Sequence, residues 1–134
     1  MPPRGERGRA RRGKRNRLSR SADFDRVYRD GRSHANRFLV LYTFPRSADA
    51  PEGDDAETRL GISVSRKVGG AVERTAVKRA LREAFWGIGE DSLPRDHDFV
   101  LVARPDSAGL VEREGTPGVD AALRELIADA GIGA

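Results

Sequence analysis

Cysteine is absent from the 134 residues of this sequence, which excludes a disulfide framework, a thiolate metal site and a cysteine nucleophile. Long apolar runs are also absent, because none approaches the roughly 18 residues that a membrane-spanning helix requires. The N-terminus is basic but lacks the apolar stretch of a secretory signal. These absences predict a cytoplasmic protein of one domain, with no membrane partner and a small core formed by its 37% hydrophobic residues.

Acidic residues are scarce in two parts of the chain, although the overall charge is only +4. Residues 1–20 contain nine Lys and Arg against one acid, and residues 59–82 contain seven against one acid. Only three of the 25 basic residues are Lys, and Arg suits bidentate contacts with phosphate. Two basic islands in otherwise acidic sequence indicate a polyanionic partner. The alternative interpretation is a solubilising tail and a solvated helix face.

Residues 1–17 contain almost nothing apolar, so we expect a disordered basic tail over residues 1–17 and a single domain over residues 18–131. Apolar residues in that domain recur with the period of a helix or of a strand. The patterns predict a helix from Ser21 to Gly31, strands over 32–36 and 38–44, an acidic loop over 46–57, a strand over 60–64, a helix over 71–87, a loop over 88–97, a strand over 99–103, a polar linker over 106–115 and a helix over 119–130 that stops at Gly131. This order predicts an α+β fold, a small two-layer α/β sandwich with the order helix–three strands–helix–strand–helix.

The predicted helix over residues 71–87 carries an apolar stripe and a basic arc side by side, at about 100° per residue. Its apolar stripe comprises Val77, Ala80, Leu81, Ala84 and Phe85. Its basic arc comprises Arg74, Lys78, Arg79 and Arg82, with no acid among them. A purely solubilising face would mix charges of both signs, so the arc favours RNA binding. We expect Trp86 to project from the same arc.

The sequence offers few residues that could catalyse a reaction or bind a metal ion. His34 and His97 are the only histidines, and the two acids beside His97 would point away from it on a strand, so we expect no metal site. Residues 46–57 hold five acids but lack calcium-loop spacing. Residues 67–70 fail the Walker pattern, while amides at the start of the following helix suit an RNA phosphate. We therefore expect no catalytic residue and no small-molecule substrate.

Small, basic and aromatic side chains are predicted to meet around the strand over residues 60–64. Ser63 and Ser65 lie opposite its apolar side chains, and Arg66 and Lys67 follow. The first helix adds Phe24 and Tyr28, for which plain core packing is the alternative. Together these residues describe a groove for single-stranded nucleic acid, bound through its backbone and therefore sensitive to salt.

Three segments of the sequence resemble the bacterial ribonuclease P protein component. They are RLGISVSRKVGGAVERTAVKRALREAF (residues 59–85), RLSRSADFDRVYRDGR (residues 17–32) and HDFVLVARP (residues 97–105). The resemblance implies an α/β sandwich with a left-handed βαβ crossover. It also implies a protein subunit that helps a catalytic RNA to remove the 5′ leader of precursor tRNA. The RNA would perform the Mg²⁺-dependent hydrolysis, so Mg²⁺ is expected to be held mainly by the RNA.

The resemblance also implies roles for individual residues. Phe24 and Tyr28, with the sheet face around Ser65, Arg66 and Lys67, would line a cleft for the leader, and the basic helix would contact the catalytic RNA. The RNA-binding residues expected are Phe24, Tyr28, Ser65, Arg66, Lys67, Arg74, Thr75, Lys78, Arg79 and Arg82. The family usually has Arg-Asn-Arg where this chain has Arg74-Thr75-Ala76, so one charge is missing. A structural RNA-binding protein of ribosomal or chaperone type, without a role in cleavage, is the alternative function.

Overall fold

A computed structural model describes residues 17–18, 21–45, 58–88, 93–94 and 97–132 of the chain. Residues 1–16 of the predicted tail and the predicted acidic loop over residues 46–57 lie outside the described residues. The elements, in order, are α2 (Ser21–Asp30), β1 (Arg32–Ala35), β2 (Leu39–Pro45), β3 (Arg59–Ser63), α3 (Ala71–Gly87), β4 (His97–Ala103) and α4 (Ser107–Ala130). The predicted fold class and element order are confirmed.

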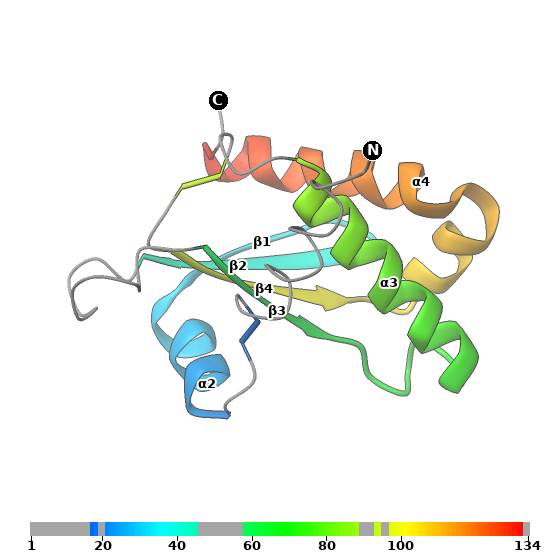
Figure 1. Cartoon of the computed structure of the whole chain (residues 1–134), viewed down its shortest axis with the longest axis horizontal. Coiled ribbons are helices and arrows are strands. Elements are labelled where there is room, and N and C mark those ends of the chain that lie inside the picture. Colours follow the sequence, from blue (N-terminus) through cyan, green and yellow to red (C-terminus); the bar gives the residue numbers. More distant parts are fainter. Residues whose placement is uncertain (1–16, 19–20, 46–57, 89–92, 95–96, 133–134) are drawn as a thin grey trace, which may run out of the picture.

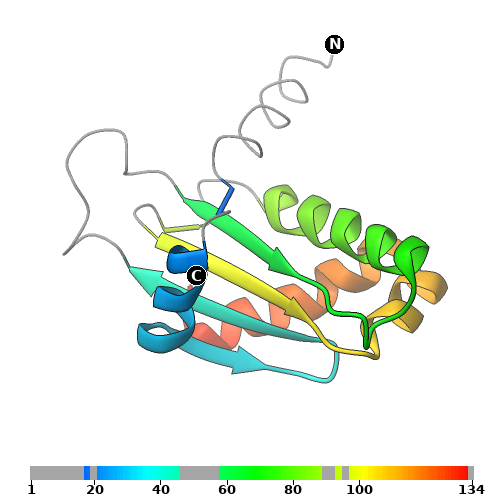
Figure 2. The same ribbon diagram turned by 90° about the horizontal axis from the view of Figure 1, so that it is seen from below.

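A four-stranded sheet with the order β1-β2-β4-β3 forms the centre of the molecule. Helices α3 and α4 cover one face of the sheet, and α2 lies on the other face (Figure 1). Seen from below, α2 covers only one end of its face, and no other helix of the described residues covers the far ends of β3 and β4 on this face (Figure 2). We call this side of the sheet the α2 face.

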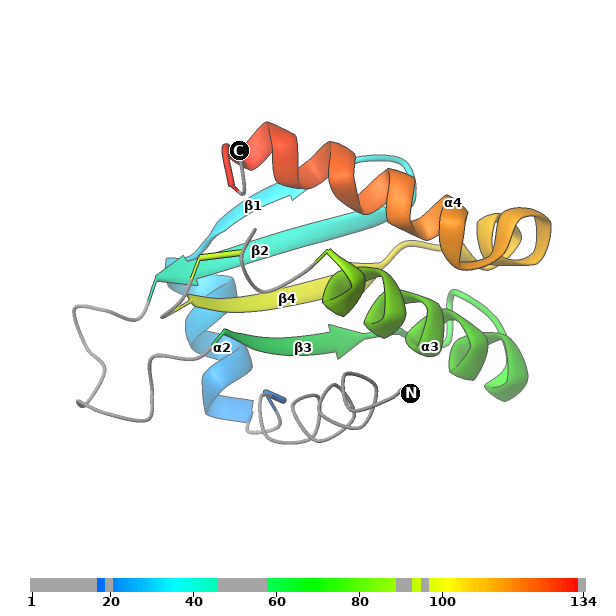
Figure 3. The same ribbon diagram turned by 45° about the horizontal axis from the view of Figure 1, so that its top comes forward.

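The connection from β3 through α3 to β4 is left-handed, as the family resemblance implies. β3 and β4 are parallel neighbours, with Arg59 opposite Asp98 and Ser63 opposite Val102. In Figure 3 both strands point to the right, α3 lies in front of the sheet, and β4 lies above β3. About 98% of such crossovers are right-handed. The left-handed path places α3 on the face of the sheet opposite α2, while the strand order leaves β3 at the edge.

The main core lies between the sheet and the two helices α3 and α4. Leu39, Leu41, Phe99 and Leu101 of the sheet and the predicted apolar stripe of α3 are buried together. A smaller cluster on the α2 face contains Leu18, Val27, Phe44 and Val100. The alternation along the strands thus directs one set of side chains to each face.

Trp86 lies on the side of α3 that carries Lys78 and Arg82, and lines one hollow with them as the sequence predicts, but it is buried there. Its side chain is only 7% exposed and meets the ring of Phe85 edge-on, with the ring centroids 4.9 Å apart. Trp86 follows Lys78 and Arg82 along one side of the helix, at successive intervals of four residues. Residues of the main core cluster nevertheless cover the indole, because burial of its large apolar surface is favourable.

The predicted polar linker over residues 106–115 is wrong, because α4 begins at Ser107. A break in the helix at Gly115, with φ 67° and ψ −156°, separates this first segment from the predicted helix. Leu110 is buried against α3, so tertiary packing stabilises a segment whose glycines and acids give it a low helix propensity. Gly131 ends α4 with φ 73°, as its stop signal predicts.

Candidate nucleic-acid interface

Three aromatic rings follow one another on the α2 face. The ring centroids of Phe24 and Tyr28 are 6.2 Å apart, and those of Tyr28 and Tyr42 are 4.9 Å apart at 71°. Tyr42 comes from β2 and was not among the predicted site residues. It shares its strand face with Val40 and Phe44, so alternation along residues 38–44 is the signal that could have identified it.

Phe24 belongs both to the core and to the surface, so the two interpretations of this ring are compatible. It is half-buried and packs against the smaller core cluster. Its ring also lies over Gly61 of β3, where a Cβ atom would be 2.6 Å from Cζ of Phe24. The missing side chain of Gly61 therefore allows the ring to lie close to the edge of the sheet.

Tyr28 is the more exposed of the two predicted aromatic residues, with 40% of its surface accessible. Partial burial raises the pKa of its hydroxyl, and a hydrogen bond with Ser63 opposes that shift. Its phenol is therefore neutral at physiological pH and presents both a ring face and a hydrogen-bonding group. Ser63 contributes to this surface from β3, as the alternation of small residues predicts.

The predicted residues Ser65, Arg66 and Lys67 form an exposed turn between β3 and α3. β3 ends at Ser63, so Ser65 belongs to the turn and does not lie on the strand face. Its hydroxyl accepts a hydrogen bond of 3.3 Å from the amide of Lys67, and its carbonyl accepts one of 3.1 Å from the amide of Val68. Burial of Val68 fixes the turn and leaves both cations in solvent.

The basic arc of α3 lies where the sequence places it. Lys78, Arg79 and Arg82 are exposed, and Arg74 is half-buried with a buried Nε that has no hydrogen-bond partner. Ion pairs of other arginines occur within the described part of the chain, but none of them involves these four residues. An arc of cations without internal partners favours an external anion.

The N-terminus of α3 already has a carboxylate at its first amides. The side chain of Glu73 accepts a hydrogen bond of 3.0 Å from the amide of Gly70, which is the half of a capping box that a glycine N-cap allows. A phosphate at this helix end would have to displace Glu73. The predicted phosphate contact at residues 67–70 therefore depends on Arg66 and Lys67 more than on the helix end.

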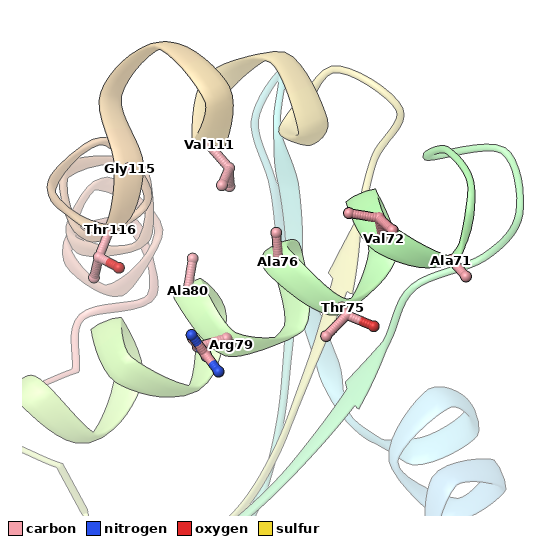
Figure 4. A pocket seen from close by; sticks show the side chains of 9 residues that line it. All are labelled: Ala71, Val72, Thr75, Ala76, Arg79, Ala80, Val111, Gly115 and Thr116. Carbon is pink, nitrogen blue, oxygen red and sulfur yellow. The ribbon is translucent and has the colours of Figure 1, made fainter.

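Thr75 and Arg79 line a different surface, a groove of about 550 Å³ between α3 and α4. Figure 4 shows Ala76 and Ala80 pointing toward α4, whereas Thr75 and Arg79 point away from it. At Ala76, where the family usually has Arg, this groove has only an exposed methyl group.

The sheet edge at β3 divides the predicted site residues between two faces. Phe24 and Tyr28 lie on the α2 face, and the basic arc lies on α3. They meet at one point, a hollow around β3 that is lined by Phe24, Lys78 and Arg82. Within the described residues, no group of three or more His, Cys, Asp or Glu side chains could hold a metal ion. No helix in the same part of the chain is long and apolar enough to cross a membrane.

Comparison with known proteins agrees with this geometry. A family model described as Ribonuclease P matches residues 13–127. The chain is 43% identical over 97 residues to the ribonuclease P protein component of Bacillus velezensis, which covers 72% of this chain and 77% of the relative. It is 40% identical over 101 residues to that of Bacillus pumilus, covering 75% and 79%.

Solved structures agree as well. The ribonuclease P protein of Staphylococcus aureus superposes with a TM-score of 0.74 at 31% identity, over 89% of this chain and 98% of that protein. The protein from Thermotoga maritima superposes with a TM-score of 0.67 at 28% identity, over 82% and 93%. The chain belongs to the ribonuclease P protein family, the RNA-binding protein component of a ribonucleoprotein that processes tRNA.

Proposed function

We propose that this chain binds the catalytic RNA of ribonuclease P through α3 and the 5′ leader of precursor tRNA on the α2 face. It thereby promotes endonucleolytic 5′ maturation of tRNA in the cytoplasm. The observation that carries the proposal is the division of charge and aromatic surface. Four cations without ion pairs lie on α3, and a series of aromatic rings lies across the edge of the same sheet.

Binding of structured RNA by α3 is supported by its charge. Phosphates dominate the affinity of proteins for nucleic acids, and Arg is suited to bidentate phosphate contacts. Arg74, Arg79 and Arg82 lie on one helix with Lys78 and without a neutralising acid among the described residues. The affinity for RNA would therefore fall steeply as the salt concentration rises. Thr75 adds a hydroxyl, but Ala76 supplies no contact of its own to a phosphate.

Binding of a single-stranded leader is supported by the α2 face. Aromatic side chains provide stacking surfaces for unpaired bases, worth about 1–3 kcal/mol for each base. Tyr28 is accessible, and the half-buried Phe24 and Tyr42 flank it. No side-chain pattern there is specific for one base, so we expect tolerance of leader sequence.

We assign the hydrolysis itself to the RNA. Mg²⁺ would supply the activated water and stabilise the charge of the leaving group when bound to that RNA. Within the described residues no group of three or more His, Cys, Asp or Glu side chains could hold such an ion, and the proposal is that the RNA holds it. The residues of this chain would position the leader and neutralise backbone charge around the cleavage site.

The experiment that tests this function measures cleavage of precursor tRNA at low Mg²⁺, with and without ribonuclease P RNA and with and without this protein. We expect no cleavage by the protein alone and restored release of the 5′ leader when protein and RNA are combined. RNA binding without any effect on cleavage would instead support a structural RNA-binding protein.

Phe24→Ala separates the two surfaces in a binding assay on the assembled ribonucleoprotein. We expect this variant to impair binding of tRNA that carries a leader more than binding of leaderless tRNA, because only the leader would contact the α2 face. Equal losses on both RNAs would mean that Phe24 acts through the core alone. Circular dichroism at the assay temperature checks that the variant is folded.

A further inference from the structure

A polar hollow of about 250 Å³ lies around the outer edge of β3. Three separate parts of the chain form it. Arg17 and Leu18 precede α2, Leu60 and Ile62 belong to β3, and the α3 side carries Lys78, Arg82 and Trp86, with Phe24 closing the hollow from the α2 face. Figure 2 shows β3 at the edge of the sheet, with α2 and α3 on either side. The hollow therefore lies between the two proposed RNA surfaces.

The charged side chains of the hollow have one sign. Arg17, Lys78 and Arg82 are exposed, and none of the described residues that line the hollow is an acid. Among the described residues none of the three forms an ion pair, although acids are present elsewhere in that part of the chain. Three like charges held together repel one another, so a bound anion would relieve a cost that the free protein bears.

The chain itself fixes Arg17 at this position. Arg17 pairs with Leu60 in a parallel bridge, and the amide of Leu18 donates a hydrogen bond of 2.9 Å to the carbonyl of Leu60. Leu18 is buried beneath it, next to Gly61 and Phe24. The backbone of Arg17 is thus held against β3, next to the hollow. Most other surface arginines of the described residues lie on helices.

We propose that this hollow binds a backbone phosphate of RNA at the point where a strand passes around the edge of β3, from the α2 face to α3. The inference rests on the proposed function, since it names the contact that would connect its two surfaces. A volume of about 250 Å³ accommodates a phosphate with part of its ribose. The rings of Phe24 and Trp86 bound the hollow, while the three cations supply the charge-assisted hydrogen bonds that phosphate oxygens accept.

Trp86 provides a direct measurement, because it is the only tryptophan of the chain and lines the hollow. The full-length protein is titrated with inorganic phosphate at constant ionic strength, with chloride as the balancing salt, and the tryptophan emission is recorded. We expect a saturable change. Arg17→Gln and Arg82→Gln should each weaken the apparent affinity about fivefold, since each removes charged donors to the same anion.

Arg113→Gln is the matched control, because it removes the same charge from an exposed position on α4, outside the hollow. It should leave the phosphate affinity unchanged. A non-saturable response, or an equal loss in Arg113→Gln, would mean general charge screening and would overturn the proposal. Circular dichroism of each variant excludes loss of folding as the cause.

A second measurement connects the hollow to RNA and separates this inference from the function on which it rests. Filter binding of leader-bearing precursor tRNA to the assembled ribonucleoprotein is repeated at several salt concentrations. Arg17→Gln should lower the slope of log affinity against log salt by about 0.7, the value for one phosphate of a single strand. An unchanged slope, with cleavage still stimulated by the wild-type chain, would refute the hollow and leave the function intact. Failure of the wild-type chain to stimulate cleavage would refute the function, whatever the phosphate titration shows.

Discussion

Replacing Gly61 by Ala would put a methyl group where the ring of Phe24 now lies. The new Cβ would be 2.6 Å from Cζ and 2.9 Å from Cε1 of Phe24, and 3.0 Å from Cβ of Leu18. These distances are too short for carbon atoms, so the ring must move away from β3. Overpacking of this kind costs about 1–3 kcal/mol. We expect a free energy of unfolding lower by about 2 kcal/mol, and a Tm lower by roughly 4 °C for each kcal/mol.

The double variant isolates the contact with Phe24. In a Phe24→Ala background the ring is gone, so Gly61→Ala should cost less than about 0.5 kcal/mol or stabilise slightly, because Ala restricts the unfolded chain more than Gly does. Thermal unfolding of the four proteins, followed by circular dichroism, gives the coupling free energy. An equal cost of Gly61→Ala in both backgrounds would show that Leu18 or the backbone of β3, and not the ring, requires glycine here.

Three further substitutions test other parts of the structure. Arg74→Ala and Arg82→Ala should each weaken RNA binding by about 1 kcal/mol and reduce the slope of log affinity against log salt by about one unit. Unchanged binding in both variants would mean that the basic arc is only a solvated helix face. Ala76→Arg restores a charge that the family usually has, so filter binding should show tighter and more salt-dependent RNA binding, and weaker binding would indicate that the groove between α3 and α4 needs its small side chain. Asp98→Ala removes a fully buried carboxylate that accepts hydrogen bonds of 2.8 and 3.0 Å from Arg59, so urea unfolding should show a loss of about 2 kcal/mol or more, and a loss below about 0.5 kcal/mol would contradict a structural role for this pair.

Local patterns in the sequence predict the elements well where one face of an element is buried. The helix over residues 71–87 has the same bounds in the structure, because a continuous apolar stripe and two flanking glycines define it. The segment over residues 106–115 failed because its helix depends on contacts with α3 that no local pattern contains. The burial of Trp86 was missed for a related reason, since a position among basic residues is buried or exposed according to what packs beside it.

The arrangement of the candidate site could not be predicted from local patterns in the sequence. Phe24 is far from Lys78 and Arg82 in the sequence, and the left-handed crossover places α3 on the face of the sheet opposite α2, so that these residues meet around β3 at the sheet edge. Handedness is a property of the connection and not of any residue pattern, so only the family resemblance implied it. Tyr42 and Arg17 were missed because their importance comes from neighbours on other strands.

The position of β3 also explains why the net charge of +4 is a poor guide to this protein. Residues 1–16 carry seven Lys and Arg against one acid, and the described chain continues from them at Arg17, on the rim of the hollow. Arg17 therefore links the basic N-terminal sequence to the edge at which Lys78 and Arg82 lie. A strand of RNA on this edge would experience a field set by local placement and screened within about 10 Å at moderate salt. Removal of residues 1–16 should consequently reduce RNA affinity and its salt dependence, and leave the phosphate titration of Trp86 unchanged, because Arg17 and its anchor at Leu60 remain. A loss of the phosphate response on truncation would instead place the anion among the tail residues.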